Sequence, residues 1–226
     1  EASLRAFALG FEGAAAAPAT PDPIAAERAA LPALPERAAH PAVQALLDRL
    51  RKDFPTAVQG LALAGVRRLI DYQDVDYAAE YLDRLAELHA LDASHGGAGH
   101  DWALSVAAAR YLAIAMSYDD VIRVADLKTR GSRFARVREE VGAKADHLVY
   151  TTEFMHPRLE EVCGTLPAGL GRWLQDSQTL GKWLDQRFNR GRRLQSGTLQ
   201  GFLLLYMAAG MRRLRRSTLR HQIETE

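Results

Sequence analysis

Apolar residues recur every three or four positions through most of this chain, which is the spacing of one helix face. The segment from Val75 to Leu88 shows it well, with apolar residues at 75, 78, 82, 85 and 88. Alanine and leucine dominate the composition and β-branched runs are nearly absent, which favours helices over strands. We therefore expect an all-α fold, a multi-helix domain with orthogonal or bundle-like packing around its own core.

Proline and capping residues indicate where the helices begin. The expected starts are Pro41, Pro55, Asp74, Asp101, Ser117, Pro157, Pro167, Leu180 and Thr198. The last helix is apolar all round from Phe202 to Ala209, so we expect that half to be buried. The short β-like run 148–152 is too isolated to form a sheet alone.

Proline also indicates the domain organisation. Six of the nine prolines fall between Pro18 and Pro41 among alanines, which predicts an extended linker over residues 18–41. The helical domain should then occupy residues 42–226. Residues 1–17 have the apolar spacing of a helix that ends a preceding domain, and the chain starts with Glu1 instead of Met. We therefore expect either a fragment or a processed product of a longer protein.

The segment 118–138 carries more charge than a surface helix needs. As one helix it would bring Arg123, Asp126, Arg130 and Arg133 into one sector, so that a single carboxylate faces three guanidinium groups. This cluster could be a partly buried network that fixes helix register. Alternatively, its surplus guanidinium groups could hold a phosphate or carboxylate of a ligand. We favour the structural interpretation, and Gly131 allows a local break in the helix.

The charge is distributed unevenly along the chain. Residues 181–226 hold ten Lys and Arg against three acidic residues, a net +7, while the rest of the chain carries −6. A basic end of this kind suggests an anionic partner, which Arg212, Arg213, Arg215 and Arg216 could bind. The alternative is a solvated helix end whose arginines satisfy the last carbonyl groups.

The sequence contains no recognisable catalytic, metal-binding or phosphate-binding motif. The single Cys163 excludes an intrachain disulfide or a four-thiolate cluster, and suggests a reducing, cytoplasmic compartment. His89, His95 and His100 match no standard metal-ligand spacing, and the Gly96–Gly99 loop lacks a phosphate-loop pattern. We assign no catalytic or metal-binding residue. No apolar run approaches the roughly 20 residues of a membrane span.

Several segments together resemble one known family. They are 72–85, 116–138, 150–158, 165–174 and 201–213, including Thr165-Leu-Pro-Ala-Gly-Leu-Gly-Arg-Trp-Leu174. In combination they resemble the helical C-terminal region of the indolepyruvate:ferredoxin oxidoreductase beta-subunit family, within the 2-oxoacid:acceptor oxidoreductases. The resemblance covers most of residues 55–226.

The resemblance implies that a gamma-type oxidoreductase domain precedes this chain, with residues 1–17 as its last helix. Enzymes of the family oxidatively decarboxylate aryl pyruvates with thiamine diphosphate, coenzyme A and iron–sulfur clusters, and pass electrons to ferredoxin. This chain has no thiamine-diphosphate motif and no cysteine set. The resemblance therefore implies that these cofactors belong to other domains or subunits.

Our leading hypothesis is an accessory helical domain of such an oxidoreductase, with no catalytic centre of its own. It would serve assembly or the docking of another subunit or ferredoxin. One alternative is a helical nucleic-acid-binding module. It is less favoured, because residues 1–180 carry a net negative charge and the sequence has no recognisable nucleic-acid-binding motif. Another is a ligand pocket around Arg123 and Arg133.

Overall fold

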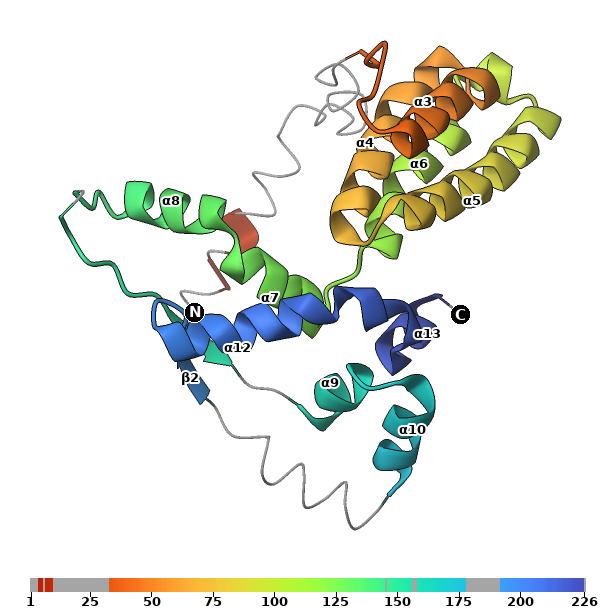
Figure 1. Ribbon diagram of the computed structural model, residues 1–226. Coiled ribbons are helices and arrows are strands. Elements are labelled where there is room, and N and C mark those ends of the chain that lie inside the picture. The colour runs from red at the N-terminus through yellow and green to blue at the C-terminus, as the bar shows by residue number, and fades with distance from the viewer. Residues whose placement is uncertain are drawn as a thin grey trace. The chain divides into compact units, whose positions relative to one another are not determined.

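The computed structural model in Figure 1 describes residues 4–5, 7–9, 33–144, 146–155, 158–177 and 192–225. The described residues are predominantly helical, so the all-α prediction is confirmed. They fall into two compact units. Unit 1 draws its described residues from Glu1–Arg67 and Ala78–Leu112, and unit 2 from Arg68–Tyr77 and Ala113–Glu226. Most of the expected linker and the expected helix at Leu180 lie outside the described residues.

The elements follow the chain in a simple order. The described helices are α3 (Pro41–Asp53), α4 (Thr56–Tyr72), α5 (Val75–Ser94), η1 (Gly97–His100), α6 (Ala103–Met116), α7 (Val121–Thr129), α8 (Gly131–Glu140), α9 (Leu159–Gly164), α10 (Ala168–Asp176), α12 (Leu199–Gly210), η2 (Met211–Ser217) and α13 (Leu219–Thr225), where η marks a 3-10 helix. Strands β1 (Thr152–Met155) and β2 (Arg192–Gln195) pair antiparallel, with Thr152 opposite Gln195. No helix among the described residues is long and apolar enough to cross a membrane.

Unit 1 is built around the apolar faces of α3, α4, α5 and α6, which lie together in Figure 1. The buried side chains include Leu46, Leu47, Leu50, Phe54, Val58, Leu61, Leu82, Leu85, Val106 and Ala109. Their three- and four-residue spacing is the one that the sequence predicted. Burial of such faces is the main favourable term in the stability of a helical unit.

A glycine lets two helices of unit 1 approach closely. Tyr81 on α5 is fully buried, and its hydroxyl donates a hydrogen bond of 2.7 Å to the carbonyl of Ala109. A Cβ added at Gly65 on α4 would lie 2.6 Å from the Tyr81 hydroxyl oxygen. Because this hydrogen bond holds Tyr81 in place, moving its ring away from an added methyl group would break the bond and cost free energy.

The start of α6 differs from the expected Asp101 cap. Asp101 and Trp102 have φ angles of 53° and 58°, and the helix begins at Ala103. The carboxylate of Asp92 accepts hydrogen bonds from the Ser105 backbone (2.9 Å) and hydroxyl (2.6 Å). A carboxylate from α5 thus accepts hydrogen bonds from the first turn of α6.

In unit 2, two helices occupy the segment 118–138, for which we expected one long helix. Arg130 is extended (φ −69°, ψ 134°), so α7 ends at Thr129 and α8 begins at Gly131. The expected start at Ser117 is also displaced, because Asp120 caps α7 and accepts a 2.6 Å hydrogen bond from the Arg123 backbone. Glycine is unfavourable in the interior of a helix, and the break falls immediately before Gly131.

The C-terminal segment also departs from the single helix that we predicted. Thr198 caps α12 as expected, accepting from Gly201, but α12 ends at Gly210 and gives way to η2 and α13. α12 packs against α7 on one side. Its fully buried residues are Gly201 and Leu205, so the predicted burial of the whole apolar half is wrong. The β-like run likewise starts later than expected, at Thr152, and finds a partner in β2.

We expect Gly65→Ala to lower the free energy of unfolding by about 1–3 kcal/mol, because the added methyl group overpacks the buried contact with Tyr81. Urea denaturation followed by circular dichroism measures the loss. Gly99→Ala is the matched control, since nothing lies within 4 Å of a Cβ at that position in the same unit. Equal effects of the two substitutions would contradict the close approach.

Candidate functional site

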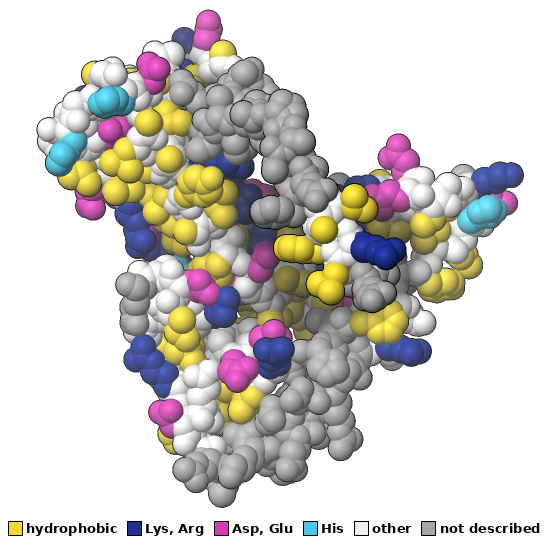
Figure 2. All heavy atoms as spheres, turned by 180° about the vertical axis from the view of Figure 1, so that it is seen from behind, with side chains coloured by type: hydrophobic (Ala, Val, Ile, Leu, Met, Phe, Trp, Pro, Cys, Tyr) yellow, Lys and Arg dark blue, Asp and Glu magenta, His cyan; other side chains and the backbone are white. Residues whose placement is uncertain are grey.

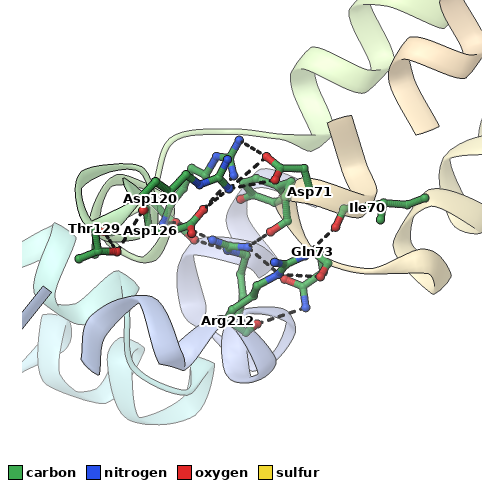
Figure 3. Close-up of polar contacts among 12 residues, drawn as sticks. Ile70, Asp71, Gln73, Asp120, Asp126, Thr129 and Arg212 are labelled. Carbon is green, nitrogen blue, oxygen red and sulfur yellow. Dashed lines mark hydrogen bonds and ion pairs between the residues drawn. The ribbon is translucent and has the colours of Figure 1, made fainter. Parts of the chain in front are cut away.

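A buried arginine makes several polar contacts in unit 2. Figure 3 shows the polar contacts of this region, among them those of Arg212 with Gln73 and Ile70. Arg215 on η2 is only 1% exposed. Its guanidinium donates to the two carboxylate oxygens of Asp120, at 2.7 and 3.3 Å, and to the carbonyl of Tyr72 at 2.5 Å. It also donates to Gln73 Oε1 at 3.1 Å and lies 4.1 Å from the centre of the Tyr72 ring. A buried charge with this many partners is compensated for its desolvation.

Arg212 extends the same set of contacts to the end of α4. Its guanidinium donates to the carbonyls of Gln73 at 2.7 Å and Ile70 at 2.6 Å, while Gln73 Nε2 donates back to the Arg212 carbonyl at 3.2 Å. The last carbonyls of a helix have no partner within the helix and carry partial negative charge. Two arginines of η2 therefore cap the C-terminus of α4.

A second layer of charge joins α7 to α4. Arg123 donates to Asp126 at 3.0 Å and to Asp71 at 2.9 Å, and Arg130 donates to the same two carboxylates at 2.5 and 3.0 Å. Burial alone would raise the pKa of Asp71, but the hydrogen bonds and charges of Arg123 and Arg130 outweigh it and lower that pKa. Two guanidinium groups and two carboxylates thus neutralise one another.

The structure brings together three of the four residues of the predicted cluster. Arg123, Asp126 and Arg130 meet as their spacing indicated, whereas Arg133 lies on α8 and pairs with Glu153 of β1. The sequence analysis missed Asp71, 52 residues before Arg123. Its position in the last turn of α4 was the available signal, but no local spacing connects it to α7.

Glu153 forms a separate ion-pair site in unit 2. It is paired with both Lys128 and Arg133, and its side chain is 12% exposed. Burial by itself raises the pKa of Glu153, but the hydrogen bonds and charges of Lys128 and Arg133 prevail and hold that pKa below its ordinary value. The carboxylate therefore stabilises the folded state in its charged form.

The four arginines that we proposed for docking divide into two pairs. Arg212 and Arg215 face inward, whereas Arg213 and Arg216 are exposed. This follows from the 3-10 geometry of η2, in which residues three apart lie on the same side. The expectation of four exposed docking arginines is therefore corrected: Arg215 is buried and Arg212 is bound to carbonyls.

The histidines and the cysteine singled out in the sequence analysis take part in packing and hydrogen bonds. No group of three or more His, Cys, Asp or Glu among the described residues could hold a metal ion. The ring of His89 lies 4.6 Å from that of Trp102, and its Nδ1 is 2.9 Å from Ser105 Oγ. Cys163 is fully buried, and burial raises the pKa of its thiol. A thiol in that setting is a weak nucleophile.

Together the fold and the network define an all-α domain whose arginines join helix ends. The chain belongs to a protein family of unknown function, DUF6537, which matches residues 58–226 and so includes every residue of the network. No curated protein and no solved structure matched the chain.

Arg215→Gln should lower the free energy of unfolding by about 3–5 kcal/mol, because it leaves Asp120 buried without its cation. Arg213→Gln, two residues earlier and exposed, should change it by less than about 0.5 kcal/mol. Urea denaturation of both variants measures the difference. Comparable small losses would show that the buried pair does not support the fold.

Glu153→Gln should destabilise the protein at pH 7, and its deficit should shrink as the pH falls below about 4.5. A lowered folded-state pKa means that the stabilisation is present above the unfolded pKa and is lost as Glu153 protonates. Urea denaturation at several pH values measures the trend. Glu139→Gln, on an exposed position of α8, is the control and should show no such trend. A deficit independent of pH would contradict the ion-pair explanation.

Proposed function

We propose that this chain is an accessory helical domain of an indolepyruvate-type 2-oxoacid:ferredoxin oxidoreductase subunit. In this role it serves assembly or partner docking during the oxidative decarboxylation of aryl pyruvates. Thiamine diphosphate, coenzyme A and the iron–sulfur clusters would belong to other domains or subunits of a cytoplasmic complex. The proposal starts from the sequence segments that resemble that family.

The observation that carries the proposal is where those segments lie. Tyr72 and Gln73 open the first of them, Asp120 and Arg123 belong to the second, and Arg212 belongs to the last. All five residues take part in the arginine network of unit 2. The resemblance thus rests on residues that hold helix ends together, which supports a framework role for the domain.

The charge balance of the network favours this framework role and disfavours ligand binding. The guanidinium groups of Arg123, Arg130 and Arg215 all donate to carboxylates within the chain. An incoming phosphate or carboxylate would have to displace Asp71 or Asp126 from pairs already formed. Nucleic-acid binding is also less favoured, because Arg212 and Arg215 are turned toward α4.

An assay of the complete natural protein that contains this chain, purified with its subunits, tests the proposal. With thiamine diphosphate and coenzyme A it should reduce ferredoxin in the presence of indolepyruvate, whereas the 226-residue chain alone should not. No reduction with any aryl pyruvate by the complete protein, or turnover by the chain alone, would overturn the proposal.

Deletion of residues 58–226 separates the two roles. If the domain serves assembly, the subunits should no longer elute together in gel filtration. If it serves docking, reduction of an artificial acceptor should persist while the KM for ferredoxin rises. A deletion that leaves assembly, artificial-acceptor activity and ferredoxin KM all unchanged would exclude both roles.

A further inference from the structure

The outer side of α12 is apolar, and no other described element covers it. We define the α12 face as five side chains: Leu199 (74% exposed), Leu203 (46%), Leu204 (55%), Tyr206 (61%) and Met207 (66%). Exposed apolar side chains occur elsewhere on the molecule, as the yellow surface in Figure 2 illustrates. The α12 face differs from isolated cases because its members share one side of one helix. Contiguous apolar surface of this kind marks interaction sites.

The spacing of the α12 face suits another helix. Leu199, Leu203 and Met207 follow one another at intervals of four residues and so form a ridge along α12. The opposite side of α12, which includes Leu205, is buried against α7. One side of the helix is therefore held in place, while the ridge on the other side is exposed.

Positive charge adjoins this apolar surface. α12 runs directly into η2, where Arg213 and Arg216 are exposed. No Asp or Glu occurs between residues 192 and 223, so the sequence around the α12 face offers no carboxylate of its own. Arg213 has no ion pair among the described residues. An apolar ridge that ends in uncompensated arginine complements an apolar stripe that ends in carboxylates.

We propose that the α12 face binds an amphipathic helix of another polypeptide, with Asp or Glu beside its apolar stripe. The apolar side chains of that helix would pack on Leu203 and Met207, and its carboxylates would pair with Arg213. This inference deepens the docking role proposed above and rests on it only in requiring a partner.

Two other occupants fit the α12 face less well. In a symmetric pair of copies the same surface would meet itself, and it would bring Arg213 of one copy toward the like charge of the other. A helix that lies in a membrane interface carries Lys or Arg along its polar side. α12 has no charged residue, and its other side is buried. Charge therefore favours an acidic helix over a second copy, and the packing of α12 favours it over a lipid surface.

The test uses two synthetic helical peptides as probes, each with leucines along one side. One has glutamates beside the leucines and the other has lysines in their place. Fluorescence anisotropy with the 226-residue chain should show that the acidic peptide binds about tenfold tighter than the basic one at low salt. Added salt should reduce that difference.

Variants locate the binding. Leu203→Asp should weaken binding of the acidic peptide by about tenfold, because it puts a carboxylate on the ridge. Leu91→Asp is the matched control, since Leu91 is 50% exposed but lies on α5 in unit 1, and it should leave binding unchanged. Arg213→Gln should weaken binding and reduce its dependence on salt.

Each other outcome would overturn the inference. The first is that the two peptides bind equally or not at all, and the second is that Leu203→Asp has no effect on binding. The third is self-association that Leu203→Asp abolishes. The fourth is binding to phosphatidylglycerol vesicles that the same variant abolishes. The ferredoxin assay of the complete protein is independent of these measurements. A failure of the peptide test would leave the proposed oxidoreductase role standing, and a failed assay would leave the α12 face as a docking site.

Discussion

The contact on which unit 2 depends most is the buried ion pair between Arg215 and Asp120. The two side chains are 1% and 5% exposed, so each charge has lost most of its hydration and needs the other. Asp120 also caps α7 through the Arg123 backbone, and Arg215 binds the Tyr72 carbonyl at the end of α4. One pair thus fixes the start of α7 and the end of α4 against η2.

Local patterns predicted much of this fold because they depend on near neighbours. The apolar spacing gave the helices of unit 1, and the intervals of three and four residues brought Arg123, Asp126 and Arg130 together. Contacts between distant parts of the chain were not predictable in this way. Asp120 and Arg215 are 95 residues apart, and only the folded helices show that one carboxylate serves both as a cap and as an ion-pair partner.

The C-terminal segment shows why local helix patterns failed there. A single helix would have put the four arginines of 212–216 on one exposed side, but the 3-10 turn rotates Arg212 and Arg215 inward and leaves Arg213 and Arg216 outside. Hydrophobicity likewise predicted that α12 would be covered. The structure covers one side with α7 and leaves the α12 face exposed. Hydrophobicity shows that a surface favours burial but not which partner buries it.

A double-mutant cycle on Arg215 and Asp120 measures how strongly the fold of unit 2 depends on this pair. The free energies of unfolding of Arg215→Gln, Asp120→Asn and the double variant give the coupling between the two side chains. If this buried pair organises unit 2, the coupling should be about 2 kcal/mol or more, with the double variant losing much less than the two single losses combined. Additive losses, with a coupling below about 0.5 kcal/mol, would show that this pair does not organise unit 2.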